Sequence, residues 1–234
     1  MKDGVNAKRP GLKTVMDYLA SLVAPTIVDV GAYIGKITRL ALEANPAIVS
    51  YAIEPDPENL KLLIQNFGTN PNVHIHGCVI GDRSGKVPLY ILDRPDQLGT
   101  SESNTLFAKV MKHKRDSLDV KARSWVGEVD SMTMDDFFAI AVQPPVVDLV
   151  KLNCEGGEYL IFGTPKHDWL KRTRMVWVSW HAQVKPFTKP EYAAKREAGC
   201  ALLVAEGFQM VDGMDIAKQK KHIWQVWKRV SDAV

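Results

Sequence analysis

The amino-acid sequence predicts an α/β protein with a mostly parallel sheet and helices on both of its faces. Short apolar, β-branched runs alternate with segments whose apolar residues recur at helical spacing, which is the pattern of successive strand–helix units. The chain then carries two strand-like runs, at 208–211 and 222–228, which predict an antiparallel pair at the end of the sheet.

The first strand–helix unit is the clearest part of the pattern. Thr26–Val30 is an apolar run typical of a strand that is buried on both faces. Gly31 and Gly35 then predict a tight turn, and Lys36–Ala44 carries its apolar residues on one helical face. The apolar run 48–53 follows as the neighbouring strand.

The other elements follow from the same two periodicities. Residues 1–24 are expected to form a loose lead-in and a first helix. Helices are expected at 12–22, 56–67, 131–141, 159–162 and 190–206, and Ser131 is expected to open the third of these. Further strands are expected at 73–76, 87–92, 120–129, 146–152 and 175–179.

Residues 85–130 break the alternation and predict an insertion of strands and loops. The long polar stretch inside it has no periodicity of its own, and such connections are either functional lids or disordered linkers. If it is a lid, Ser101, Ser103 and Asn104 are the candidates for binding hydroxyl groups of a substrate. A basic run at 109–115 is either a solvated surface or a docking patch for an acidic substrate.

Composition places the chain among ordinary globular proteins. Its 234 residues suffice for a sizeable core, and one domain is expected over 1–234. The net charge of +3 is too small to argue for a nucleic-acid partner. Three widely separated cysteines without a CxxC pair predict a reducing, cytoplasmic compartment. There is no apolar signal-peptide core and no apolar stretch long enough for a membrane span, so none is expected.

The glycine turn and the acid that follows it predict a nucleoside site. Glu54 ends the second strand roughly twenty residues beyond the turn, where an acid can accept hydrogen bonds from ribose hydroxyls. The turn lacks the middle glycine of a dinucleotide fingerprint, and Asp29 just before it would repel a phosphate and suit an ammonium group. S-adenosylmethionine has an ammonium group, a ribose and no phosphate. Alternatively, the glycines only form a turn and Glu54 is a solvated acid.

Four segments together resemble the FkbM-type S-adenosylmethionine-dependent methyltransferases: IVDVGAYIGKIT, AIEPDPENLKLLIQNF, VIGDRSGKV and VDLVKLNCEGGEYLIF. The resemblance covers about residues 26–181. It implies a Rossmann-like class I methyltransferase fold, with seven strands of which the last is antiparallel. It also implies methyl transfer, most often to a hydroxyl oxygen of a sugar or small molecule.

The resemblance also implies which residues bind the cofactor. The turn would hold the methionine end, Glu54 the ribose, Cys78 and Val79 the adenine, and Asn153 and Glu155 would lie near the sulfonium. The full expected set is Asp29, Gly31, Ala32, Tyr33, Ile34, Gly35, Glu54, Pro55, Cys78, Val79, Asn153 and Glu155. The family usually has aspartate where this chain has Asn153, and the lost carboxylate weakens any case for a divalent metal, so none is predicted.

A hydroxyl acceptor needs a base, and His181 is the first candidate because histidine titrates near neutral pH. Glu155 is the second, and Asn153 completes the expected catalytic group. The alternatives are that His181 is a strand-end histidine bonded to backbone, and that Glu155 is a helix N-terminal acid or a partner for the cofactor ammonium. Glu158 is expected to be ordinary first-turn charge.

Two rival functions stay open at this point. A nucleic-acid methyltransferase would use the basic runs and aromatic residues, and would bind RNA or DNA with a steep salt dependence. A cofactor-binding protein without transferase activity is the other, and it is kept open by Asn153 and Ser179, which depart from the family pattern.

Overall fold

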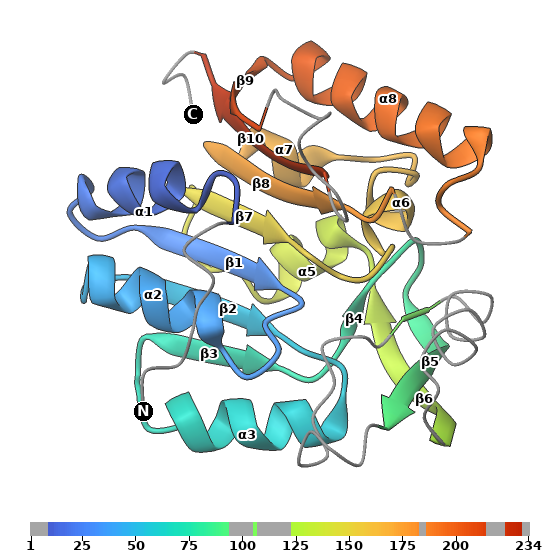
Figure 1. Ribbon diagram of the computed structural model, residues 1–234. Coiled ribbons are helices and arrows are strands. Elements are labelled where there is room, and N and C mark those ends of the chain that lie inside the picture. The colour runs from blue at the N-terminus through green and yellow to red at the C-terminus, as the bar shows by residue number, and fades with distance from the viewer. Residues whose placement is uncertain (1–8, 94–104, 107–122, 183–185, 214–222, 231–234) are drawn as a thin grey trace.

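The computed structural model describes residues 9–93, 105–106, 123–182, 186–213 and 223–230. Its centre is a seven-stranded sheet with the order β3-β2-β1-β7-β8-β10-β9 (Figure 1). Five neighbouring strands are parallel: β3 (Val73–His76), β2 (Val49–Ile53), β1 (Thr26–Val30), β7 (Leu149–Leu152) and β8 (Met175–Trp180). The strand β10 (Ile223–Arg229) runs antiparallel between β8 and β9 (Phe208–Asp212), as predicted.

The central strands are buried on both faces, so alternate residues meet two different sets of helices. Ile27, Leu149 and Trp177 point to a core that α1 (Leu12–Ala20) and α2 (Lys36–Ala44) complete. The helix α3 (Pro57–Phe67) covers the neighbouring part of the sheet around β2 and β3. Val28, Val150 and Val178 point the other way.

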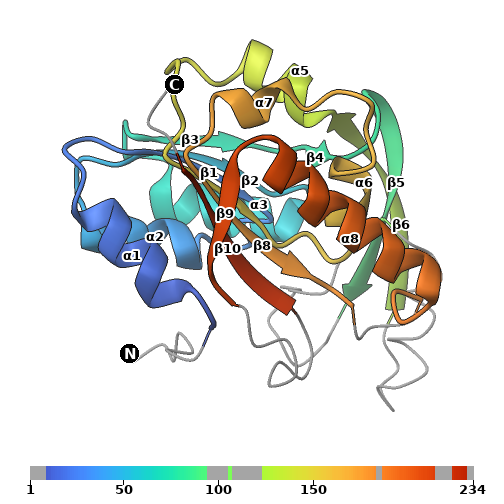
Figure 2. The same ribbon diagram turned by 90° about the horizontal axis from the view of Figure 1, so that it is seen from above.

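The second face carries the remaining helices. They are α5 (Met134–Ile140), α6 (Glu158–Ile161), α7 (Asp168–Lys171) and α8 (Pro190–Ala205). Figure 2 shows α1 and α2 on one side of the sheet and α5 and α7 on the opposite side. The expected three-layer α/β architecture is therefore confirmed.

The expected insertion is a small second sheet, in which β6 (Arg123–Met132) lies between β4 (Val79–Ile80) and β5 (Gly85–Asp93). The strands β5 and β6 pair antiparallel along their whole length. This sheet lies beyond the carboxyl ends of the central strands (Figure 1). It therefore stands beside the edge where ligands bind in open α/β sheets.

Several boundaries differ from the prediction by a few residues, and the start of α5 shows why. The strand β6 continues through Ser131, whose Oγ donates to the Arg83 carbonyl at 2.8 Å, so Ser131 does not open a helix. The helix α5 starts three residues later and is capped by Thr133, whose Oγ1 accepts a hydrogen bond from the Asp136 N–H. Both residue types favour helix caps, and the strand pairing decides between them. No helix in the described parts of the chain is long and apolar enough to cross a membrane.

Candidate active site

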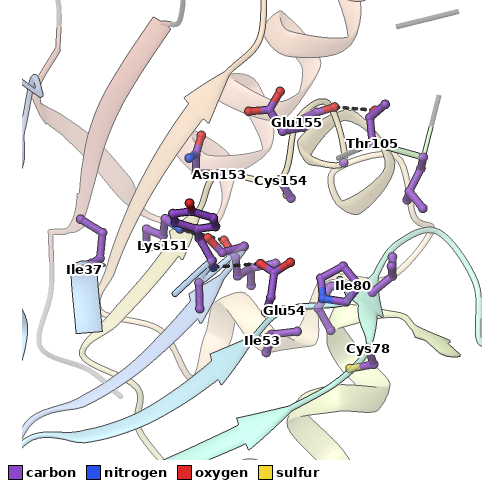
Figure 3. A pocket seen from close by; sticks show the side chains of 18 of the residues that line it. Ile37, Ile53, Glu54, Cys78, Ile80, Thr105, Lys151, Asn153, Cys154 and Glu155 are labelled. Atoms are coloured by element: carbon purple, nitrogen blue, oxygen red, sulfur yellow. Dashed lines mark hydrogen bonds between the residues drawn. The ribbon is translucent and has the colours of Figure 1, made fainter. Parts of the chain in front are cut away.

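A cavity of about 310 Å³ opens at the carboxyl ends of β1, β2 and β7 (Figure 3). Nine of the twelve expected cofactor residues line it, although they come from separate parts of the chain. They are Gly31, Ala32, Tyr33, Glu54, Pro55, Cys78, Val79, Asn153 and Glu155. Glu54 and Cys78 lie on one wall, and Asn153 and Glu155 lie on the opposite one (Figure 3).

The glycine turn lies close to both neighbouring strands. Gly31 has a φ of +75°, and a Cβ there would lie 2.1 Å from the Asn153 carbonyl oxygen. The N–H groups of Gly31 and Ala32 both donate to the Ile53 carbonyl, at 3.0 and 2.9 Å. Only glycine satisfies both the backbone angle and the close approach at this point. The turn is thus tied to β2 on one side and meets the strand end at Asn153 on the other.

Glu54 connects that turn to the start of α3. Its carboxylate accepts hydrogen bonds from the Tyr33 N–H at 2.8 Å, and from the Asp56 N–H and the Asn59 amide, both at 3.1 Å. Burial raises the pKa of Glu54 to about 7, against the lowering effect of these hydrogen bonds. A nearly buried carboxylate on the cavity wall can accept hydrogen bonds from ribose hydroxyls.

Asp29 does not face the cavity, contrary to expectation. It is 1% exposed, its carboxylate lies 2.8 Å from Lys151 Nζ, and Thr38 Oγ1 donates to it at 3.0 Å. The ammonium of Lys151 also donates to the carbonyls of Val30 and Gly31, at 3.1 and 2.7 Å. The negative charge of Asp29 is therefore balanced by Lys151 inside the protein. Because Lys151 also bonds the carbonyls at the start of the glycine turn, the ion pair stabilises that turn.

Two other expected turn residues also lie outside the cavity lining. Gly35 has a φ of +85° where α2 begins, and a Cβ there would lie 2.2 Å from the Phe67 ring. It therefore allows α3 to pack closely against the turn. The carbonyl of Ile34 accepts a hydrogen bond from the Asn66 amide, also on the α3 side. Ser101, Ser103 and Asn104 fall outside the described residues.

The loop between β7 and α6 forms the opposite wall. Glu155 has a φ of +54°, and its carbonyl accepts a hydrogen bond from Thr105 Oγ1 at 2.9 Å (Figure 3). Tyr33 is the other non-glycine residue with a positive φ in the described chain, and both line the cavity. Such backbone strain persists only where the surroundings hold it in place, and it gathers at functional sites.

His181 does not have the character of a general base. It is fully buried, with Nδ1 3.2 Å from Glu158 and Nε2 3.3 Å from Glu155. Burial alone would lower its pKa, but the charges of Glu158 and then Glu155 outweigh burial and raise the pKa to about 10. An imidazolium has no free lone pair, so it cannot take a proton from an acceptor near neutral pH. This burial between two acids argues against His181 as the base, and the identity of the base stays a prediction.

Glu158 is also more than first-turn helix charge. It is 0% exposed and accepts hydrogen bonds from the backbone N–H groups of Cys154 and Gly156, at 2.7 and 2.9 Å. Its pKa is lowered: burial acts to raise it, but the charge of His181 and the hydrogen bonds outweigh burial. Two ionic clusters are therefore buried beside the cavity. One joins Asp29 to Lys151, and the other joins Glu158 to His181.

The cysteines on the walls are poor nucleophiles. Burial, helped by Asp130, raises the pKa of Cys78 to about 11, and burial and Glu158 raise that of Cys154 well above its usual value. In the described chain, no group of three or more His, Cys, Asp or Glu side chains is arranged to hold a metal ion. His74 and His76, a pair spaced as metal ligands can be, stack on the Tyr51 ring instead.

The sequence analysis did not predict the roles of Lys151 and Glu158, although the sequence contains an indication for Lys151. It interrupts the apolar run of β7 (Leu149–Leu152), and a charged residue in a strand buried on both faces needs a partner. That partner is Asp29, the residue directly opposite it in the β1–β7 pairing. Thr105, which comes from the polar insertion, had no such signal.

The fold and the cavity together define a Rossmann-like methyltransferase of class I: a sheet with an antiparallel last strand, a glycine turn after β1 and an acid after β2. The family model for the methyltransferase FkbM domain matches residues 29–203. The chain belongs to this family, and it is an S-adenosylmethionine-dependent methyltransferase.

Two of three similar solved structures share the fold with a TM-score of 0.50 or more, at low identity. A putative rRNA-methylase from Clostridium thermocellum has a TM-score of 0.53 at 9% identity, over 95% of this chain and 97% of that one. A human methyltransferase 10 domain containing protein has a TM-score of 0.50 at 11% identity, over 94% and 80%. The N-terminal domain of human METTL16 in complex with SAH has a TM-score of 0.46 at 10% identity, over 94% and 68%. No curated protein matches the sequence.

Proposed function

We propose that this protein transfers the methyl group of S-adenosylmethionine to a hydroxyl of a sugar or another small molecule. The observation that carries the proposal is the Glu155 side chain. It lines the cavity beside Asn153, and the side chain is 18% exposed, so it can meet an acceptor. A hydroxyl must lose a proton as it is methylated, and a carboxylate within hydrogen-bond reach can accept it.

The residues around the cavity fit the cofactor. The cavity volume falls in the range of small-molecule sites, roughly 300–1,000 Å³. In our proposal the glycine turn holds the methionine end, Glu54 accepts hydrogen bonds from the ribose, and Cys78 and Val79 lie against the adenine. Asp29 acts through Lys151 on the shape of the turn instead of meeting the ammonium group. When bound, the cofactor supplies a methyl group on a sulfonium, which is a good leaving group.

The protein has two tasks in this reaction. The walls must align the acceptor oxygen with the methyl group, and alignment supplies much of the rate in such displacements. Glu155 must then take the hydroxyl proton. A cytoplasmic location remains part of the proposal, and it is supported by the free thiols of Cys78, Cys154 and Cys200.

Methylation of a nucleic acid is the second candidate, because two cationic side chains, Arg9 and Lys36, line the cavity in addition to Lys151, which is paired with Asp29. Each lies near an aromatic ring: Arg9 is 5.7 Å from the centre of Trp224, and Lys36 is 5.0 Å from that of Tyr33. This pairing of cation and ring also suits a stacked base. The two candidates differ in salt dependence, which is steep for a polyanion and shallow for a neutral sugar.

The deciding experiment offers labelled S-adenosylmethionine with sugars, small alcohols, phenols and an RNA pool, at low and high salt. We expect transfer to a hydroxyl compound that Glu155→Gln slows by roughly 10²-fold or more, with cofactor affinity retained in calorimetry. Glu128→Gln, an exposed acid on β6, is the matched control and should keep wild-type rates. Labelling of RNA alone, lost at high salt, would overturn the proposal in favour of the second candidate.

A further inference from the structure

Three ionisable side chains form a connected row that starts in the cavity wall beside Asn153 and runs into the protein interior. His181 follows directly after β8, Glu158 begins α6, and Glu155 lies on the loop between β7 and α6. The imidazole stands between the two acids, 3.2 Å from Glu158 through Nδ1 and 3.3 Å from Glu155 through Nε2. Glu158 and His181 are both 0% exposed, whereas Glu155 reaches the cavity.

The buried end of this row also holds the loop itself. Each Glu158 carboxylate oxygen accepts a backbone N–H, from Cys154 and Gly156, so the residues on both sides of Glu155 are fixed to one acid. Gly156 has a φ of +101°, and a Cβ there would lie 2.1 Å from Phe187. The Thr105 hydroxyl holds the Glu155 carbonyl from the side of the small sheet. The backbone on both sides of Glu155 is therefore held in place, which limits the directions that its side chain can take.

The charge state of the row follows from its geometry. Burial opposes a charged imidazole, but Glu158 and then Glu155 outweigh it and raise the pKa of His181 to about 10. These two acids are the charged groups that act on His181, and the Cys154 thiol lies against Glu158. One imidazolium between two carboxylates leaves a net negative charge of one. Glu155 thus lines the cavity while one of its oxygens lies 3.3 Å from the imidazolium.

A purely structural contact does not account well for this arrangement. Burying an ion pair costs desolvation, and apolar side chains of similar size often give equal or better stability. Where such a pair ends in a group that reaches a cavity, it orients that group for chemistry, as the third member of a catalytic triad orients its histidine.

We propose that Glu158 and His181 are positioning residues that hold the Glu155 carboxylate against the acceptor hydroxyl. This inference rests on the proposed function. In the step, the acceptor oxygen forms a bond to the methyl carbon as the carbon–sulfur bond breaks with its electron pair moving to sulfur. The hydroxyl proton passes to Glu155, which releases it to solvent afterwards.

The test is Glu158→Gln, which keeps the size of the side chain and removes its charge. We expect kcat to fall by roughly tenfold or more while the cofactor dissociation constant changes less than about threefold. The wild-type kcat should stay level from neutral pH to about pH 9. In the variant the pKa of His181 falls, so kcat should decline across the same range as Glu155 loses its cation.

Histidine NMR gives a readout that needs no acceptor. The ring of His181 should remain an imidazolium near neutral pH in the wild type and titrate there in Glu158→Gln. His74→Gln, an exposed histidine on β3, serves for assignment and should leave kcat unchanged. His181→Gln retains an amide donor for Glu155 but has no imidazole to titrate. Its kcat should therefore show no decline at alkaline pH that comes from residue 181.

Different results would overturn the proposed function and the positioning role of Glu158 and His181. A wild-type protein that methylates no hydroxyl acceptor overturns the proposed function and the positioning role that rests on it. Hydroxyl transfer with an unchanged rate, pH profile and His181 titration in Glu158→Gln overturns the positioning role alone. A variant that has also lost cofactor binding would show that Glu158 holds the loop for the cofactor, which equally contradicts the role proposed here.

Discussion

Glu54 shows how one buried side chain serves several parts of the site. It bonds the turn after β1 through the Tyr33 N–H and the start of α3 through Asp56 and Asn59. These partners explain why an acid that is 5% exposed is tolerated here. Its pKa of about 7 nevertheless means that burial costs more than the hydrogen bonds recover.

This imbalance makes stability depend on pH. Because the folded pKa of Glu54 is raised from 4.5 to about 7, its contribution is fully present below pH 4.5 and is lost as pH rises through 7. Relative to Glu54→Gln, the cofactor-free wild type should lose roughly 3 kcal/mol of unfolding free energy across that range. Urea unfolding of both proteins at pH 4.5 and pH 8 measures the difference. Parallel pH curves for the two proteins would contradict the assignment.

The Asp29–Lys151 ion pair makes a second prediction for single residues. Lys151→Met leaves a buried carboxylate without its cation, so we expect it to cost about 3–5 kcal/mol of unfolding free energy. Adding Asp29→Asn should restore much of the loss, because the unpaired charge is then gone. A double-mutant cycle by urea unfolding measures the coupling. If the two single losses simply add, the pair is not an energetic unit.

At the scale of elements, the turn between β1 and α2 depends on how closely β7 approaches it. The central strands bring Gly31 to the Asn153 carbonyl, and the N–H groups of the turn bond back to β2. Sequence reasoning found the turn and its acid, but it could not find the carbonyl that Gly31 faces, because Asn153 lies far away along the chain.

A pair of alanine substitutions separates this close approach from backbone strain. Gly31 and Gly207 have similar φ angles, +75° and +83°, but the nearest atom to a Cβ is at 2.1 Å for Gly31 and at 3.5 Å for Gly207. Gly207→Ala should therefore cost about 1 kcal/mol from strain alone. Gly31→Ala should cost more and also weaken cofactor binding, as measured by thermal unfolding and calorimetry. Equal losses at the two sites would mean that the close approach does not matter.

At the scale of the whole molecule, the cavity joins two sheets. The central sheet supplies the turn, Glu54 and Glu155, and the small sheet supplies Leu89 and the neighbouring Thr105. A ligand that contacts both parts binds only the folded protein, so it must raise the unfolding temperature.

We expect S-adenosylmethionine at about 100 times its dissociation constant to add roughly 2.7 kcal/mol of stability. For a chain of this size that corresponds to a shift of roughly 5–10 °C in Tm. S-adenosylhomocysteine should act similarly, and NAD should not, because the turn lacks the middle glycine of a dinucleotide site. Scanning calorimetry with each ligand tests this selectivity. Stabilisation by NAD instead would contradict the interpretation that the glycine turn does not bind a dinucleotide.

Much of the fold could be predicted because its signals are local. The apolar periods of β1, α2 and α3 and the glycine turn lie within a few turns of chain, and their type and order were confirmed. One exception lies at Ser131, where strand pairing with β5 and β4 overrode a local capping signal.

By itself, the sequence determined the class of protein, the order of most of its strands and helices, and nine of the residues that line the cavity. Only the tertiary structure decided what the buried ionisable groups do: Asp29 pairs with Lys151, and His181 is a cation between Glu155 and Glu158. The physical reason is that secondary structure follows from neighbours along the chain. A charge state follows from burial and from partners in space, which only the fold brings together.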